Sequence, residues 1–407
     1  MAAESADLRR QLRRVERRRS LRAFLLVAPL VLFLLVVFVW PIGGLLWRSV
    51  DNSELQQVMP ATAAGLLAWD GEGLPPEAVQ ASLVQELRAA VSNGVVGVVG
   101  RRLNYEDSGM RSLLNQTLRK LPTQEPASWQ AALQAVSPRW ADPATWQLLR
   151  RAAPATTDRY WLATLDRERN VTGDIVPLPD QERVYLSIFS RTLQIAGIVT
   201  LLCLLLGYPL AYLLATLPTG TGNLLLILVL LPFWTSLLVR TASWIVLLQS
   251  GGLLNQGLQG LGLISAPLEL VFNRFGVIVS MTHILLPFMV LPLYSVMKGI
   301  PAHYQRAAIS LGAHPFAAFW QVYVPQTMAG VGAGVILVFI MALGYYITPA
   351  LLGGPADQMV SYYVAYYTNT TNNWGMAAAL GSLLLVVTLL LYLVYQRLTQ
   401  QPNPQRR

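Results

Sequence analysis

Few residues of this chain have the types and spacing that catalysis requires. Neither of its two lysines, Lys120 and Lys298, follows the glycine pattern of a phosphate-binding loop, so the sequence predicts no ATP hydrolysis through such a loop. The histidines show no metal-ligand spacing; they are His283, His303 and His314. We therefore expect no catalytic residue, no metal site and no bound cofactor in this chain.

The most informative chemistry is that of a contact surface, in residues 304–325. Ala307 and Ala308 are strong helix formers with little bulk, so a short helix there can lie close against another protein. Gly312 permits a backbone turn that a Cβ would hinder. Pro315 then favours the start of a second helix, which carries an apolar face made of Phe316, Phe319 and Trp320. The alternative is an ordinary amphipathic connector.

The composition indicates the membrane as the setting of this loop. Hydrophobic residues make up 54% of the chain and charged residues 13%, against about 25% charged residues in soluble domains. Charge-free stretches follow Arg22, Arg191 and Arg306, and each exceeds the roughly 20 residues that cross a bilayer. Cys203 falls in such a stretch and is expected to be a small packing residue. His283 either packs in its stretch or faces a pathway.

Six transmembrane helices are predicted, which makes the fold class an all-α membrane protein. None of them contains an aspartate or glutamate, which disfavours an ion-coupled carrier. The predicted spans are 23–47, 187–215, 223–249, 276–297, 328–352 and 376–396. The first span has no signal-peptide cleavage pattern behind it and is expected to be retained.

The charge distribution predicts the orientation. Eight arginines lie in the first 22 residues, whereas residues 48–186 carry 14 basic and 16 acidic side chains. The positive-inside rule then places both termini and the loop around Arg306 in the cytoplasm. The net charge of +9 is therefore explained without nucleic acid as a partner.

Residues 48–186 are too many for a simple connector. Five tryptophans and several helical patterns predict an inserted, mostly helical extracytoplasmic domain between the first two spans, with a partly disordered loop as the alternative. The helical patterns cover 77–90 and 110–121, and helix starts are expected at Ser128 and Asp142. The predicted divisions are a basic cytoplasmic N-terminus (1–22), the first span (23–47), the inserted domain (48–186), a five-helix core (187–396) with a cytoplasmic loop at 298–327, and a cytoplasmic tail (397–407).

Several ordered motifs support a family resemblance. They are Leu-Pro-Phe-Trp-Thr-Ser-Leu-Leu-Val-Arg-Thr at 231–241, Leu-Leu-Pro-Phe-Met-Val-Leu-Pro-Leu-Tyr at 285–294, Ala-Leu-Gly-Tyr-Tyr-Ile-Thr-Pro-Ala-Leu-Leu-Gly-Gly at 342–354 and Asn-Trp at 373–374. With the 304–325 loop, they resemble the permease subunits of type I ABC importers, in the spermidine/putrescine branch. The resemblance covers about 187–396 and does not cover 48–186.

The resemblance implies a role for the loop. Its first helix would insert into a groove of a separate ATPase, and ATP-driven closure of two ATPases would move the attached spans. The family pattern is Glu-Ala-Ala, three residues, then Gly; here Arg306 and Ser310 stand at commonly acidic positions, which predicts an acidic groove on the partner or a heterodimer in which this loop contributes less. The implied coupling residues are Arg306, Ala307, Ala308, Leu311, Gly312, Ala313, Phe316, Phe319 and Pro325.

The resemblance also implies partners and a location. The implied partners are an ABC ATPase subunit dimer that binds the ATP and Mg, a second permease subunit that forms a heterodimer with this chain, an extracytoplasmic substrate-binding protein and membrane lipid. The location is the inner membrane of a bacterial cell. Residues that line the path are candidates only, because an interfacial aromatic belt explains their aromatic members equally well; they are Trp234, Thr235, Arg240, Tyr345, Tyr346 and Thr348.

Three other functions are compatible with parts of the sequence. Permeases for ferric iron, opines, phosphonates or amino-acid derivatives share parts of the motifs. An ion-coupled secondary transporter lacks the expected intramembrane acids. A membrane-anchored receptor that binds a ligand through residues 48–186 leaves the 304–325 loop unexplained.

Overall fold

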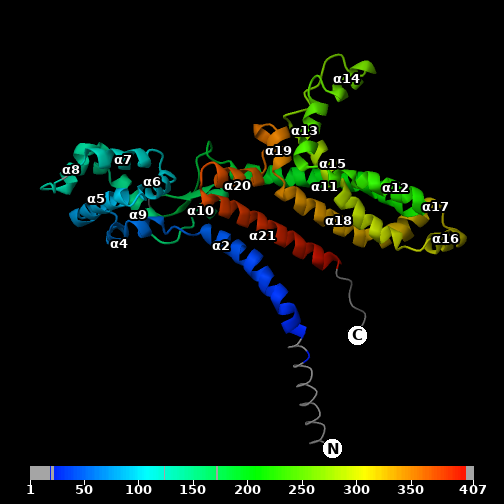
Figure 1. Cartoon of the computed structure of the whole chain (residues 1–407), viewed down its shortest axis with the longest axis horizontal. Coiled ribbons are helices and arrows are strands. Elements are labelled where there is room, and N and C mark those ends of the chain that lie inside the picture. The colour runs from blue at the N-terminus through cyan, green and yellow to red at the C-terminus, as the bar shows by residue number, and fades with distance from the viewer. Residues whose placement is uncertain (1–18, 20–22, 123, 171–172, 400–407) are drawn as a thin grey trace, which may run out of the picture. The chain divides into compact units, whose positions relative to one another are not determined.

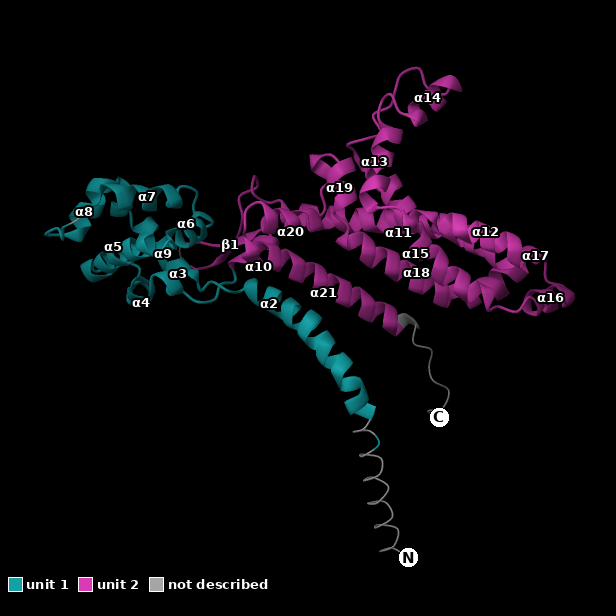
Figure 2. Ribbon diagram, in the orientation of Figure 1, with its two compact units in different colours: residues 1–158 teal, residues 159–407 magenta. Residues whose placement is uncertain are grey.

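The computed structural model describes residues 19, 23–122, 124–170 and 173–399. Helices dominate these residues (Figure 1), and the chain divides into two compact units, Met1–Asp158 and Arg159–Arg407 (Figure 2). Residues 159–184 thus group with the helices that follow them. The predicted basic N-terminus and the end of the predicted tail lie outside the described residues, apart from Arg19 and residues 397–399.

Unit 1 begins its described part with the first membrane-length helix, Ala23–Arg48. Within it lie a π-turn, η1 (Leu35–Val39), and α2 (Trp40–Arg48). Pro41 has no N–H to continue the α-helical ladder, and the Trp40 N–H just before it donates to the Leu35 carbonyl five residues back. The extra residue of the π-turn therefore precedes the proline directly.

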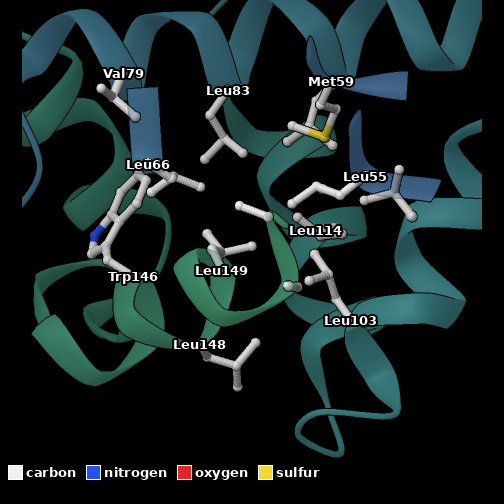
Figure 3. Close-up of a cluster of buried hydrophobic side chains, with 14 of the residues drawn as sticks. Leu55, Met59, Leu66, Val79, Leu83, Leu103, Leu114, Trp146, Leu148 and Leu149 are labelled. Atoms are coloured by element: carbon white, nitrogen blue, oxygen red, sulfur yellow. The ribbon is translucent and has the colours of Figure 1, made fainter. Parts of the chain in front are cut away.

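The rest of unit 1 is a helical domain around one core. Figure 3 shows Met59, Leu83 and Trp146, which come from separate segments of the chain, pointing into this core. Trp140 and Trp146 are fully buried, and each indole N–H has an acceptor: Thr117 Oγ1 at 2.9 Å and the Trp140 carbonyl at 3.0 Å. The elements are α3 (Glu54–Val58), α4 (Pro60–Ala68), α5 (Glu77–Ser92), α6 (Val96–Asn104), α7 (Met110–Lys120), α8 (Trp129–Val136), η2 (Pro138–Ala141) and α9 (Pro143–Ala152).

The predicted helix starts of this domain are confirmed. The Ser128 side chain caps α8 by accepting from the Ala131 N–H, and Asp142 caps α9 by accepting from the Ala144 N–H. The two ends of the domain meet at Asn52, whose buried amide donates to the carbonyls of Ala152 and Pro154. A chain that enters and leaves at one place is typical of an inserted domain.

Unit 2 opens with α10 (Arg159–Thr164) and a short antiparallel hairpin, β1 (Arg167–Arg169) with β2 (Ile175–Pro177). The expectation of an all-α chain is therefore wrong in this detail, although helix predominates. Asp166 lies just before β1, and its carboxylate accepts from the N–H groups of Val184, Tyr185 and Leu186. These N–H groups lie at the start of α11, so Asp166 caps that helix from a distant segment.

The prediction of six membrane-length helices is confirmed for the described residues. Three of them, α11 (Tyr185–Thr216), α15 (Arg274–Lys298) and α18 (Val324–Gly344), share one core, and α21 (Trp374–Thr399) packs beside α18. At 1.5 Å per residue α11 is about 48 Å long, more than the hydrocarbon thickness. Pro209, Pro287 and Pro292 lie inside these helices.

The third span differs from the prediction of one continuous helix over 223–249. The predicted stretch is divided between α12 (Thr219–Leu230) with η3 (Leu231–Trp234) and α13 (Leu237–Leu248), with extended backbone at Thr235 and Ser236. Thr219–Trp234 is a shorter apolar helix, and the membrane-length segment runs over Leu237–Gly260 instead. Pro232 cannot donate to the helix ladder, and its own carbonyl accepts from the Thr235 hydroxyl at 2.9 Å. A separate helix, α14 (Leu253–Gly260), follows beyond Gly251 and Gly252.

The fifth span also differs from the predicted 328–352. Its helical run begins at Pro315, ends at Gly344, and is followed by a separate short helix, α19 (Ile347–Leu352). Pro349 has no N–H for the Tyr345 carbonyl, which instead accepts from the Ser361 hydroxyl at 2.6 Å. The remaining elements are η5 (Pro355–Asp357) and α20 (Val360–Asn369).

Glycines allow the three core helices to approach closely. A Cβ added at Gly330 would lie 3.1 Å from the Pro292 carbonyl oxygen, and one at Gly207 would lie 3.0 Å from Met289 Cγ. Gly330 and Gly334, four residues apart on α18, thus let this helix pack closely on α15.

Candidate functional site

The first half of the candidate coupling loop is α16 (His303–Ser310), which ends in a glycine turn. Gly312 has a φ of +93°, and its N–H donates to the Ile309 carbonyl while the Ala313 N–H donates to the Ala308 carbonyl. This pair of bonds is the Schellman arrangement, in which glycine avoids the Cβ strain of the left-handed conformation. No atom lies within 4 Å of a Cβ built at Gly312, so the turn is open on its outer side.

The surface of this half-loop is exposed and carries both apolar and polar side chains. None of the residues of α16, all of which the structure describes, is buried, and Leu311 just after it is 89% exposed. Ala307 is exposed and Ala308 half-buried. Arg306 is exposed and forms no ion pair with any residue that the structure describes.

The second half of the loop is α17 (Pro315–Ala318) with the π-turn η4 (Phe319–Tyr323). His314 caps α17, since its Nδ1 accepts from the Phe316 N–H at 3.3 Å. Phe316 and Trp320 are 68% and 54% exposed, whereas Phe319 is half-buried. The predicted single apolar face is therefore wrong for Phe319, because the ring turns toward the helix core.

Phe319 is the centre of an aromatic anchor that sequence reasoning missed. Its ring meets Tyr212 at 5.5 Å and Tyr208 at 6.4 Å, both edge-on from α11, and stacks on Tyr323 at 5.7 Å. The Tyr208 hydroxyl also lies 3.1 Å from Thr327 Oγ1. The sequence does show Tyr208 and Tyr212 four residues apart, on one face of the second span. It does not show that both contact Phe319, which lies more than 100 residues later in the chain.

Pro325 marks the join of the loop to the membrane helix. The Val324 N–H before it donates to the Phe319 carbonyl five residues back, which closes the π-turn. The loop is thus continuous with α18 through a helical segment.

The second group of candidates forms a polar cluster between α13, α15 and the α18–α19 break. The Thr241 and Thr348 hydroxyls lie 3.5 Å apart and are buried, and Tyr345 is hydrogen-bonded to Thr348. Arg240 acts electrostatically on Tyr345 and on His283, and its Nε is buried with no hydrogen-bond partner. Three of the predicted path residues, Arg240, Tyr345 and Thr348, are thus brought together.

Two members of this cluster were not assigned from the sequence. Trp244 Nε1 lies 3.3 Å from His283 Nδ1, with the two rings edge to face at 5.5 Å. Thr241 sits one residue after Arg240, and its buried hydroxyl is visible in sequence only as one more polar residue in an apolar span.

The other three candidates lie apart from the cluster. Trp234 and Thr235 lie at the break between α12 and α13, where Trp234 is 75% exposed. Tyr346 lies between α18 and α19 and is 41% exposed. In the described part of the chain no group of three or more His, Cys, Asp or Glu side chains is placed to hold a metal ion.

Comparison with known proteins assigns the helical core. Residues 205–402 match the family described as "Binding-protein-dependent transport system inner membrane component". The spermidine/putrescine transport system permease PotB of Haemophilus influenzae is 36% identical over 220 residues, covering 54% of this chain and 77% of that protein. PotB of Escherichia coli is also 36% identical, with 80% of its length covered.

A more distant relative is also a transport permease. The molybdenum transport system permease ModB of Mycobacterium bovis is 30% identical over 203 residues, covering 50% of this chain and 75% of that protein. A bacterial alginate ABC transporter structure gives a TM-score of 0.45 at 18% identity, covering 54% of this chain and 79% of that one. The chain therefore belongs to the family of binding-protein-dependent transport system inner membrane components and is the non-enzymatic permease subunit of an ABC importer, which works with a separate ATPase and a substrate-binding protein.

Proposed function

We propose that this permease imports polyamines, spermidine or putrescine. The observation that carries the proposal is the 36% identity to PotB over 220 residues, which is higher and longer than the 30% over 203 residues to the molybdenum permease. Another small solute, such as iron, an opine, a phosphonate or an amino-acid derivative, is the alternative.

Uptake into proteoliposomes tests this substrate. The permease is reconstituted with its ATPase and binding protein, and radiolabelled spermidine and putrescine are supplied outside. Uptake that needs both ATP and the binding protein is the expected result. Tight binding of a different solute by that binding protein, with no spermidine uptake, would replace the polyamine assignment.

The loop of α16 and α17 is proposed to couple this path to the ATPase. Its exposed Leu311, Phe316 and Trp320 offer apolar side chains to a partner groove, and the open turn at Gly312 leaves room for close approach. Phe319 and its tyrosines fix the loop to α11, so a push on the loop is carried into the membrane helices. Arg306 predicts carboxylates in the partner's groove, because an arginine pairs with them bidentately.

Gly312→Asp tests the coupling. The φ of +93° at Gly312 disfavours aspartate less than it disfavours bulkier residues. The new carboxylate would extend from the open turn toward the partner. We expect the complex to assemble and to hydrolyse ATP without substrate uptake. Wild-type uptake by this variant would disprove the coupling role, and Gly73→Asp, at another open positive-φ turn in unit 1, is the matched control.

The orientation is proposed to place both termini, α16 and α17 in the cytoplasm, with unit 1 outside the membrane apart from its first helix. The support is the arginine-rich start of the chain and the near balance of charges over 48–186. Because Cys203 is buried, single cysteines placed at Gly73 and Ser310 can be labelled selectively. An impermeant thiol reagent applied to intact cells should label the first position and spare the second.

The remaining assignments follow from the importer role. ATP and Mg are proposed to bind the partner ATPase dimer, with no cofactor on this chain. A second, different permease subunit is proposed to complete the path, because a charge-inverted Arg306 fits one half of an asymmetric pair. The membrane lipid contacts the exposed apolar side chains of the spans.

A further inference from the structure

The three core helices of unit 2 are joined to one another at both ends. At one end, α15 leads into α16, the loop of α16 and α17 leads into α18, and Phe319 of this loop contacts Tyr208 and Tyr212 near the end of α11. At the other end, about 37 Å away along α15, α11 and α15 begin and α18 stops. Figure 1 shows α16 and α17 at one end of these helices and α20 at the other. We call the residues that join this second end, 353–361, the clasp.

Arginines near the starts of two core helices bind the clasp. Arg274, the first residue of α15, donates from Nε to Asp357 Oδ1 at 3.0 Å. The Arg191 guanidinium, near the start of α11, donates to the neighbouring Ala356 carbonyl. The Asp357 side chain is 10% exposed and that of Arg274 is 46% exposed, and salt screens a partly buried ion pair less than an exposed one. The clasp therefore holds the first turns of α11 and α15 together.

Backbone contacts complete the clasp. The Val360 N–H donates to the buried Thr192 hydroxyl of α11 at 3.0 Å. The Ser361 hydroxyl donates to the Tyr345 carbonyl, just past the end of α18, at 2.6 Å. A Cβ added at Gly353 would lie 3.0 Å from a side-chain methyl carbon of α15, so the clasp lies directly against that helix. All three core helices thus contact one short segment of the chain.

We propose that Arg274 and Asp357 are positioning residues for the coupling step, in which the clasp makes the three core helices move as one body when the ATPase displaces the loop of α16 and α17. Packed helices can slide past one another by small shear motions. A push at one end of the three helices would be absorbed by such sliding if their far ends were free. The inference rests on the proposed coupling role of the loop, and it is independent of which residues line the path.

The ratio of substrate taken up to ATP hydrolysed tests the clasp. The full importer complex is reconstituted with its binding protein, and spermidine uptake and ATP hydrolysis are measured together. Asp357→Asn keeps the shape of the side chain and removes its charge. We expect this variant to hydrolyse ATP and to lower the ratio about fivefold or more, the lower end of typical coupling between distant sites. Arg274→Lys keeps the charge pair and should keep the ratio near that of wild type. Arg183→Gln is the matched control, because it breaks the exposed ion pair of Arg183 with Asp180 before α11.

A cross-link supplies a rescue. Arg274→Cys combined with Asp357→Cys removes the ion pair and leaves two thiols that a short bifunctional reagent can join, since the native Cys203 is buried. We expect the double variant to be uncoupled and the cross-linked protein to regain the wild-type ratio. A monofunctional thiol reagent is the control and should restore nothing.

Three results would overturn the proposal. One is a wild-type ratio in an assembled Asp357→Asn complex; should that variant fail to assemble, Arg274→Gln breaks the pair from its exposed side and gives the same test. Another is uptake and hydrolysis that fall in proportion, because that is the effect of a structural defect alone. The third is a verified cross-link that blocks uptake or leaves the ratio low, because joining the two positions would then not be what coupling needs. Failure of the wild-type complex to take up spermidine would instead contradict the proposed substrate, and normal coupling of Gly312→Asp would contradict the role of the loop.

Discussion

Gly334 of α18 lies directly against Met289 of α15. A Cβ added at Gly334 would lie 2.7 Å from the Met289 sulfur and 3.2 Å from the Met289 carbonyl oxygen. Met289 is fully buried, and Gly207 of α11 lies on it as well. One methionine thus fills the space that two glycines leave, and the three helices that form the transport core meet at this point.

We therefore expect Gly334→Val to destabilise the permease. Overpacking of a filled core costs about 1–3 kcal/mol, and the backbone oxygen of Met289 has less freedom to move than its thioether. Thermal unfolding of the purified protein in detergent should shift downward by several degrees. Gly197→Val is the control, since no atom lies within 4 Å of a Cβ at Gly197; an equal shift in both variants would contradict the packing argument.

Phe319→Ala should affect the stability of the permease, whereas Phe316→Ala should affect its binding to the ATPase. Phe319 is half-buried among Tyr208, Tyr212 and Tyr323, so its truncation should lower stability by up to about 3 kcal/mol and loosen the loop. Phe316 is 68% exposed, so its truncation should leave stability unchanged and weaken binding of the ATPase. Hydrogen exchange of residues 303–323 and co-purification of the ATPase measure the two effects. Loss of stability in the Phe316 variant would show that its ring is structural.

Arg306→Glu should weaken the complex with the natural ATPase about tenfold or more, because it places like charges together across the contact. The loss should shrink as salt is raised, since exposed charges are screened. The affinity of Arg306→Gln for the ATPase should fall between those of wild type and Arg306→Glu. Tighter binding by the Glu variant, measured by titration of purified subunits, would mean that the partner's groove is basic.

Asp166→Ala should destabilise the start of α11. Its carboxylate accepts three backbone N–H groups, and its own φ of 54° is strained for most side chains. Loss of the three hydrogen bonds, together with the added strain of alanine at a positive φ, should cost about 1–3 kcal/mol. Asp166→Asn tolerates the backbone conformation and should lose less. Exchange protection of the Val184 to Leu186 amides reports the effect, and unchanged protection in the Ala variant would contradict the capping role.

The helical domain of unit 1 should weaken in acid through Glu77. The Ser128 side chain, and then the Trp129 N–H at 2.7 Å, hold the pKa of Glu77 below its usual value. A carboxyl group with a depressed pKa in the folded state contributes stability above its unfolded pKa, and that contribution is lost as pH falls through the folded pKa. Glu77→Gln should therefore be less stable than wild type at pH 7, with the gap closing as pH falls below about 4. A gap that persists in acid would contradict this assignment.

The sequence by itself determined the membrane class, the six spans, the helical nature of residues 48–158 and the family, because apolar length, charge, caps and ordered motifs are local properties. It also marked Gly312 and Pro325, whose backbone chemistry is independent of partners. The sequence did not decide helix continuity. The predicted third and fifth spans are interrupted near Pro232 and Pro349, where the Thr235 hydroxyl donates to the Pro232 carbonyl and the Ser361 hydroxyl donates to the Tyr345 carbonyl.

The tertiary structure alone decided which side chains meet. Phe319 turns toward tyrosines more than 100 residues away, and Trp244 of α13 meets His283 of α15. Asp166 caps a helix that begins 19 residues later, after a hairpin. Such contacts depend on the crossing and rotation of packed helices, which close-packed residues such as Gly334 and Met289 fix and which no local pattern encodes.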